Sequence, residues 1–293
     1  MRDSPDNDTS GDAEPFQLEL LRRAGPQRRS ALASALTNQA LERAHAGIAR
    51  AHPDMSELDR RLLFVEIHYG IELAERVREF LRTRPGSPAS GGDLGMNRPD
   101  FEAFFPIAEA LESMGVGYFI GGSVASSAHG VVRSTLDVDV VAALPEARAG
   151  EFAQRLGDAY HVDIDTVRDA IRRRSSFNLI HLATMYKIGV FVQRARDYDQ
   201  AAAGRAVKLR VFGEQAREFP VVSPEDSILS KLDWYLIGGE SSQRQWADIV
   251  GLPRSRGASL DLEYLHRWAK TLRLEDLLAQ AMRHAADRRS PPT

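Results

Sequence analysis

Two aspartates in an apolar stretch are the residues of this sequence whose type and spacing best suit chemistry. Asp137 and Asp139 are separated by one residue in a segment that reads as a strand, so both carboxylates point to the same face. Carboxylates held that close repel each other, and a divalent cation between them removes the repulsion. The pair therefore predicts a site for Mg²⁺ (or Mn²⁺).

A glycine-rich turn precedes this pair. Gly121, Gly122 and Ser123 lie between a short apolar strand and a short helix of small residues, and Ser123 is 14 residues before Asp137. Glycines let the backbone approach a phosphate, and the N-terminus of a helix presents free N–H groups to it. Solvated aspartates on an edge strand beside an ordinary turn are the simpler alternative. The combination favours a nucleoside-triphosphate site, with phosphates at the turn and a metal at the aspartates.

The elements around this stretch alternate between helix and strand. Strands are expected at 116–120, around Asp137–Val141, at 160–162, as a hairpin of 177–181 with 187–192, and near 207–212 and 219–222. Helices are expected at 100–114, 124–129, 145–157 and 164–174, and again beyond Ser223. This pattern predicts an α/β fold, a mixed sheet flanked by helices, with a C-terminal helical bundle.

The N-terminal part has a different pattern, without a strand signal. One apolar stripe recurs at four-residue steps and a second follows a break at 52–54. The first stripe comprises Leu32, Leu36, Ala40, Ala44 and Ile48, and the second Leu62, Val65, Tyr69, Leu73 and Val77. We therefore expect a disordered tail at 1–13, a helical domain at 14–84, a flexible linker at 85–99, the α/β core at 100–222 and a helical subdomain at 223–293. We also expect residues 98–293 to fold without the N-terminal helices.

The composition excludes several classes of protein. The 293 residues include no cysteine, which excludes disulfides and cysteine-ligated zinc or iron–sulfur sites. A net charge of −3 argues against a broadly basic nucleic-acid-coating protein. No apolar run reaches the ~20 residues of a membrane helix, and the acidic N-terminus resembles no signal peptide. A cytoplasmic protein without a membrane partner is expected.

The stretch GGSVASSAHGVVRSTLDVDVV resembles the nucleotidyltransferase superfamily, in the branch of the AbiEii-type and MenT-type toxins. The similarity extends through FNLIHL, YKIGVFV, SPEDSILSKLDWY and RQWADIVGL, and so spans about 101–252. The resemblance implies transfer of a nucleoside monophosphate from a nucleoside triphosphate to an acceptor hydroxyl, on tRNA or another RNA. It implies phosphate contacts at Gly122 and Ser123 and a metal at Asp137 and Asp139.

The resemblance also assigns roles to two residues of the C-terminal helices. Lys231 and Asp248 match the family's lysine and late acid near the nucleotide, although either residue would also suit an ordinary helix surface. One departure concerns the strand at 187–192, where active relatives carry a third metal-binding carboxylate. This sequence has Gly189 there. A catalytically impaired nucleotide-binding or interaction module is therefore the alternative to an active enzyme. Asp163 and Asp165 are nearby acids in the sequence, but no sequence pattern places them at the site.

The N-terminal segment resembles a small helical protein that is often encoded beside such nucleotidyltransferases. This resemblance implies a partner or regulatory domain, and a self-regulated fusion of the toxin–antitoxin kind is a third interpretation.

Two further features have structural interpretations. The run Arg168, Arg172, Arg173 and Arg174 suits a solvated helix face better than an RNA contact. Trp234, Tyr235 and Trp246 suit helix packing better than base stacking.

Overall fold

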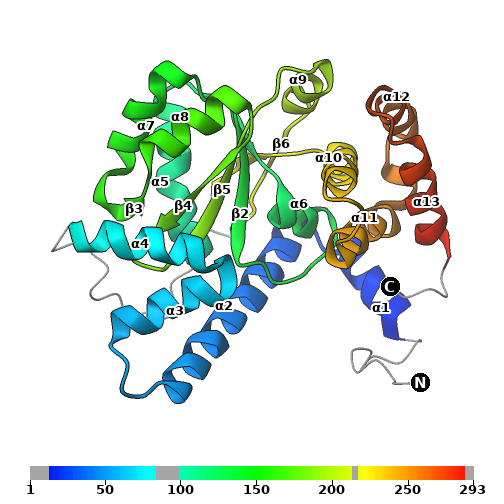
Figure 1. The fold of residues 1–293 in the computed structure, drawn as a ribbon. Helices are drawn as coiled ribbons and strands as arrows, with labels where there is room; N and C mark the ends of the chain where they lie inside the picture. Colours follow the sequence, from blue (N-terminus) through cyan, green and yellow to red (C-terminus); the bar gives the residue numbers. More distant parts are fainter. Residues whose placement is uncertain (1–12, 84–98, 213–216, 288–293) are drawn as a thin grey trace.

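A mixed sheet of seven strands forms the centre of the molecule (Figure 1). The computed structural model describes residues 13–83, 99–212 and 217–287. Almost all of the expected tail and linker lies outside these residues, and the two described positions, Ala13 and Pro99, begin helices. The strand order is β3-β4-β5-β2-β1-β7-β6. The strands are β1 (Tyr118–Ile120), β2 (Asp137–Ala142), β3 (Tyr160–His161), β4 (Ser176–His181), β5 (Tyr186–Val192), β6 (Val207–Leu209) and β7 (Phe219–Val221). The neighbours β2 and β5 are parallel, as are β1 and β7, and the remaining pairs are antiparallel.

Helices surround this sheet. On its buried face, where Val138, Val140, Ile188 and Val190 point, α5 packs against β2 and β5, and α7 and α8 continue the layer. The helices of this part are α5 (Pro99–Ser113), α6 (Gly122–His129), α7 (Ala149–Leu156), α8 (Ile164–Arg173) and α9 (Asp197–Gly204). The sequence did not indicate α9. The fold class is the one the sequence predicts.

The C-terminal helices form a second, smaller apolar cluster. They are α10 (Pro224–Ile237), α11 (Gln243–Arg256), α12 (Leu262–Leu272) and α13 (Glu275–Ala286). Ser223 begins α10 as the sequence predicts: its side chain accepts a hydrogen bond from the backbone N–H of Asp226, and Pro224 occupies the first turn. This cap fixes where α10 starts and so fixes which of its residues face the sheet.

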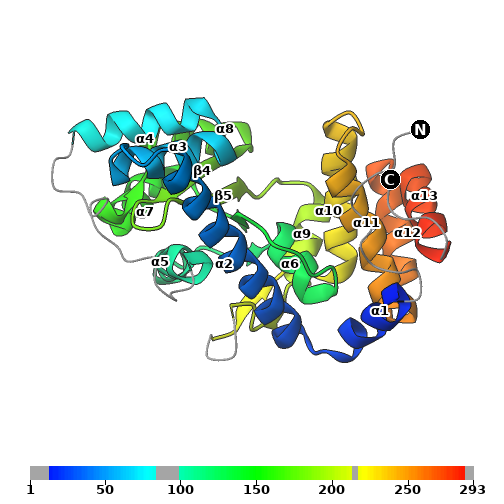
Figure 2. The same ribbon diagram turned by 90° about the horizontal axis from the view of Figure 1, so that it is seen from below.

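Four helices precede the sheet, α1 (Ala13–Arg23), α2 (Pro26–Ala51), α3 (Glu57–Tyr69) and α4 (Ile71–Thr83). Leu62, Phe64, Val65 and Val77 are fully or almost fully buried in the same apolar cluster as the sheet residues. Arg61 extends from α3 and donates hydrogen bonds to backbone oxygens of the loop between β4 and β5. The N-terminal helices and the sheet therefore share one core. Figure 2 shows α2 running beneath the molecule toward α6.

One expected stripe is only partly correct. Leu32 and Leu36 are 44% and 45% exposed, whereas Ala33, Leu41 and Ile48 of α2 are buried. A strict four-residue step advances further than one helical turn of 3.6 residues, so a stripe written with that step drifts around the helix. The second stripe is buried in large part, but it is divided between α3 and α4 at Gly70. None of the described helices is long and apolar enough to cross a membrane.

Candidate functional site

The two aspartates lie on the face of β2 that is not covered by α5. Along β2 burial alternates, with Asp137 and Asp139 partly exposed and Val138 and Val140 buried. In the parallel pairing with β5, Asp137 is opposite Lys187 and Asp139 is opposite Gly189. Residues opposite each other share a face, so this register places Lys187 beside Asp137 and Gly189 beside Asp139 on the same face of the sheet.

Asp139 lies directly against the glycine turn. The backbone N–H of Gly121 donates to the backbone oxygen of Asp139 at 2.9 Å. Gly122 has a φ of +55°, and a Cβ added there would lie 2.0 Å from Asp139 Oδ2. Only glycine combines this left-handed backbone with the absence of a side chain, so Gly122 allows the carboxylate to reach the N-terminus of α6. The turn and the aspartate are adjacent, as their spacing predicts.

The electrostatics of Asp139 favour a cation. Burial raises the pKa of Asp139 to about 7, and the nearby charge of Asp137 adds to this increase, whereas Lys187, Lys231 and Arg133 oppose it. A carboxylate whose charged form is disfavoured in this way is stabilised by a divalent cation, and carboxylate oxygens are suitable ligands for Mg²⁺. The donors on this face therefore fit the metal that the sequence predicts.

Asp137 is held by neighbours on both sides. Lys187 Nζ is 3.2 Å from Asp137 Oδ2, and Thr135 Oγ1 donates to Asp137 Oδ1 at 2.9 Å. The Lys187 ammonium also lies 5.3 Å from the centroid of the Tyr69 ring, a cation–π contact. Asp137 therefore has a partner of opposite charge even without a bound cation, whereas Asp139 forms no ion pair with any of the described residues.

The N-terminal helices fix the segment that leads into β2. The backbone N–H of Thr135 donates to Thr37 Oγ1 of α2 at 3.1 Å, in a buried position. The hydroxyl of Tyr69, at the end of α3, donates to the backbone oxygen of Leu136 at 2.7 Å. Residues 37 and 69 therefore set the position of the backbone immediately before Asp137.

Lys231 and Asp248 meet in a buried network at the start of α6. Lys231 Nζ donates to Asp248 Oδ2 at 2.9 Å, and Arg133 donates to both carboxylate oxygens of Asp248 at 2.8 and 2.9 Å. Arg133 also donates to Ser123 Oγ. Burial alone raises the pKa of Asp248, but the hydrogen bonds from Arg133 and the charges of Lys231 and Arg133 outweigh it and leave the pKa below its ordinary value. Asp248 is therefore an anion that holds two cations in place.

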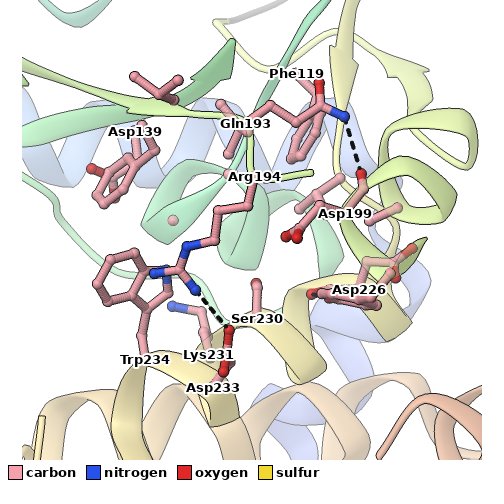
Figure 3. A pocket seen from close by; sticks show the side chains of 18 of the residues that line it. Phe119, Asp139, Gln193, Arg194, Asp199, Asp226, Ser230, Lys231, Asp233 and Trp234 are labelled. Carbon is pink, nitrogen blue, oxygen red and sulfur yellow. Dashed lines mark hydrogen bonds and ion pairs between the residues drawn. The ribbon is translucent and has the colours of Figure 1, made fainter. Parts of the chain in front are cut away.

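A cavity of about 400 Å³ opens between the sheet and α9 and α10. Its wall includes Gly121, Gly122, Asp139 and Lys231, but not Asp137, Ser123 or Asp248. Figure 3 shows Asp139 on the sheet side and Lys231 on the α10 side of this space. The volume is in the range of small-molecule sites. The structure thus brings one predicted metal ligand, the turn and the predicted lysine to a single cavity.

Part of the cavity wall is apolar. Phe119, Val141 and Phe191 line it from the sheet. Trp234 of α10 is 39% exposed, lies edge-on to Phe191, and has the Arg194 guanidinium 4.8 Å from its ring centroid (Figure 3). The expectation that Trp234 packs within the helices is therefore wrong, because its position on α10 faces the cavity.

Tyr235 and Trp246 do pack between helices, as expected, with ring centroids 5.2 Å apart. The exposed arginines of α8 also follow expectation. Arg168, Arg172 and Arg173 form surface ion pairs with acids of α8 or of the neighbouring turn at 146–148. Arg174 differs, because it ends the helix in a left-handed conformation and lines the cavity.

A third carboxylate does not join the aspartates. Within residues 13–83, 99–212 and 217–287, no group of three or more His, Cys, Asp or Glu side chains is placed to hold a metal ion. Asp163 caps the N-terminus of α8 and accepts hydrogen bonds from that helix, and Asp165 pairs at 3.7 Å with Arg168. Neither lines the cavity. Gly189 is not part of a β-bulge, because its strand pairs without interruption on both sides.

Sequence reasoning missed several residues of this site. Arg133 lies between the glycine turn and the aspartates, and a lone arginine in a stretch of small and apolar residues was the signal available. Lys187 was visible in the strand with Gly189, but its pairing with Asp137 depends on the β2–β5 register. Arg194 and Trp234 meet only through tertiary packing.

Comparisons with known proteins add little to this geometry. No protein-family model matches the chain, and no curated protein sequence matches it. Among solved structures, the chain is similar to the antibiotic-resistance factor ANT(2'')-Ia, determined in solution. The TM-score is 0.41 and the identity 15%, and the match covers 62% of this chain and 96% of that chain. A similarity of this size carries no argument about the site, so the assignment rests on the residues described above.

Proposed function

We propose that this chain binds a nucleoside triphosphate with Mg²⁺ and transfers the nucleoside monophosphate to a hydroxyl of an RNA acceptor. The observation that carries the proposal is the carboxylate of Asp139, which lies against Gly122 at the N-terminus of α6 and faces a cavity that Lys231 also lines. A helix N-terminus attracts phosphate, and a carboxylate pair attracts the metal that accompanies a triphosphate.

The reaction would form a bond between the acceptor oxygen and the α-phosphorus and break the bond to the bridging oxygen, which releases pyrophosphate and the hydroxyl proton. Asp137 and Asp139 would hold the cation, which neutralises phosphate charge when bound. Gly122 and Ser123 would hold phosphates at the free N–H groups of α6, and Gly121, whose own N–H bonds to Asp139, would let the backbone approach them. Lys231, held in place by its hydrogen bond to Asp248, would stabilise the negative charge that develops during transfer.

The charges around the cavity support an anionic acceptor such as RNA. Asp199, Asp226 and Asp233 line the cavity, but Asp199 and Asp233 are paired with Arg196 and Asp226 lies 3.6 Å from Arg205, so none of the three offers a free carboxylate to a cationic acceptor. Arg174 lines the same cavity and forms no ion pair within the part of the chain that the structure describes. A tRNA 3′ end is the acceptor that the sequence resemblance implies, and a toxin is the role it implies.

A second candidate function is binding without turnover. The observation in its favour is Gly189, which lies opposite Asp139 at the position of the relatives' third acid. A site with two carboxylates lacks one ligand and one negative charge for binding a pair of cations. Losing a residue that only hydrogen-bonds a metal ligand already lowers metal affinity or activity by roughly 10–100-fold, and losing a ligand itself should cost at least as much. In this case the chain is a nucleotide-dependent interaction module.

Regulation by the N-terminal helices is compatible with either function. Thr37 and Tyr69 hold the backbone before Asp137, so a change in the packing of α2 or α3 would move a proposed metal ligand. This arrangement supports a site whose geometry depends on the N-terminal segment.

One experiment separates the two functions. Binding of each of four nucleoside triphosphates is measured by calorimetry with and without Mg²⁺, and transfer of radiolabel to total RNA is measured in parallel. Magnesium-dependent binding with labelled RNA supports the enzyme, and binding without label supports the module. Asp139→Asn is expected to abolish binding with a melting temperature near that of the wild type. Unchanged nucleotide affinity in this variant would refute the assignment of the site.

A further inference from the structure

A row of three residues crosses the site face of the sheet. Asp139 on β2 is opposite Gly189 on β5, and Gly189 is opposite Asn178 on β4. These three strands are neighbours in the sheet (Figure 1). Because directly opposed residues share a face, the Asp139 and Asn178 side chains rise on either side of a residue that has no side chain.

The space above Gly189 is bounded by oxygen atoms. A Cβ added at Gly189 would lie 2.9 Å from Asp139 Oδ1 and 3.9 Å from Asn178 Oδ1, with the edge of the Phe191 ring at 3.4 Å. The φ of Gly189 lies outside the left-handed region, so the backbone does not require glycine here. The gap therefore separates a carboxylate oxygen on one side from an amide oxygen on the other.

Asn178 is free to use its amide oxygen. Its side chain is exposed, and it has no hydrogen-bond partner among the residues that the structure describes. Amide oxygens of asparagine are accepted ligands of hard divalent cations, together with carboxylates and water. Asn178 thus offers a neutral oxygen on the strand next to Gly189, beside the space that Gly189 leaves without a side chain.

We propose that Asn178 is a ligand of the divalent cation held by Asp139 and takes the place of the missing third carboxylate. This inference rests on the proposed function, because it needs a cation at Asp139. A neutral third ligand leaves the two aspartates as the only negative charges of the ligand set. Two negative charges neutralise the charge of one divalent cation but not of two. We therefore infer that the site binds a single cation.

The test uses the full-length chain with Mn²⁺ as probe and reads bound Mn²⁺ by electron paramagnetic resonance, with the nucleotide present at a fixed concentration. Asn178→Ala is expected to weaken Mn²⁺ binding by roughly 10-fold or more, and Asn178→Asp to tighten it. Ser176→Ala is the matched control, because Ser176 is exposed on the same strand and two residues away on the same face. It is expected to bind Mn²⁺ as the wild type does.

A double substitution tests whether the two positions serve one cation. Gly189→Asp restores an acid between Asp139 and Asn178, and the Asp139 carboxylate must turn away from the new Cβ, which its side chain allows. If Asn178 is a ligand of the same cation, Gly189→Asp tightens binding more in the Asn178→Ala background than in the wild type, because the two changes are coupled. Gly189→Asn controls for size without charge.

The outcomes distinguish this inference from the proposed function. If Asp139→Asn removes Mn²⁺ binding but Asn178→Ala and Asn178→Asp both bind as the wild type does, the role of Asn178 is refuted and the metal site stands. If Asp139→Asn binds Mn²⁺ normally, the metal site is refuted and the role of Asn178 with it. If the effects of Gly189→Asp and Asn178→Ala on Mn²⁺ affinity are additive, the two positions do not serve the same cation and the inference is also refuted.

Discussion

Replacing Gly122 with alanine should separate the metal site from the fold. Gly122 has a φ of +55°, and its new Cβ would lie 2.0, 2.7 and 2.8 Å from Oδ2, Cγ and Cβ of Asp139. Contacts this short force the whole carboxylate to move, not only its outer oxygen. Two costs result: a left-handed backbone at a residue with a Cβ, about 1–3 kcal/mol, and the displacement of a proposed metal ligand.

Gly157→Ala measures the first cost alone. Gly157 has a φ of +56°, and nothing lies within 4 Å of a Cβ added there. Both variants should therefore lose about 1–3 kcal/mol through a positive φ at a residue with a Cβ, which lowers the melting temperature by a few degrees at roughly 2–4 °C per kcal/mol. Gly122→Ala should lose more, because Asp139 is packed against the added methyl group.

The two variants should differ most in binding. Calorimetric titration with a nucleoside triphosphate and Mg²⁺ should give wild-type affinity for Gly157→Ala and a loss of roughly 10–100-fold for Gly122→Ala. Scanning calorimetry of the same samples gives the stability. If Gly122→Ala binds the magnesium nucleotide as tightly as Gly157→Ala, Asp139 does not hold the metal from its position against the turn, and the reasoning fails.

Three further predictions concern Asp139, Asp248 and the N-terminal helices. Below pH 7 the Mg²⁺ affinity should fall by about tenfold per pH unit, because a proton competes with the cation for Asp139, whose pKa is raised to about 7. The metal-free protein should become more stable over this interval, since folded Asp139 keeps a proton that the unfolded chain has released, and Asp139→Asn should remove this gain in stability. Asp248→Asn should lower the free energy of unfolding in urea by up to about 3–5 kcal/mol, because it leaves two partly buried cations, Lys231 and Arg133, poorly paired. Asp165→Asn, at an exposed ion pair, should change it little. A chain that starts at Met96 should aggregate, because the N-terminal helices share the core of the sheet. This differs from the expectation based on the linker composition. Adding residues 1–84 in trans should restore a soluble protein.

The sequence was most informative where a local pattern determines a local structure. The glycine turn and the spacing of Asp137 and Asp139 follow from strand alternation and helix-terminus geometry, and Ser223 marked the start of α10. The hairpin of β4 with β5 was also visible, because two apolar runs lie only a few residues apart in the sequence.

The remainder depends on contacts between distant segments. The ion pair of Lys187 with Asp137 requires a parallel register that no short motif encodes. The exposure of Leu32 and the position of Trp234 at the cavity depend on which elements pack against α2 and α10. The network of Arg133 with Asp248 joins residues 115 positions apart. A single sequence gives the types of these residues but not their partners.

The hydrogen bonds from Thr37 and Tyr69 to the backbone before Asp137 have a thermodynamic consequence. If cation binding depends on these contacts, the free energy that couples them is the same in both directions. A loaded site would then hold α2 and α3 more firmly against the sheet, and an empty site would release them more easily. Proteolysis of the N-terminal helices would report site occupancy from more than sixty residues away in the sequence.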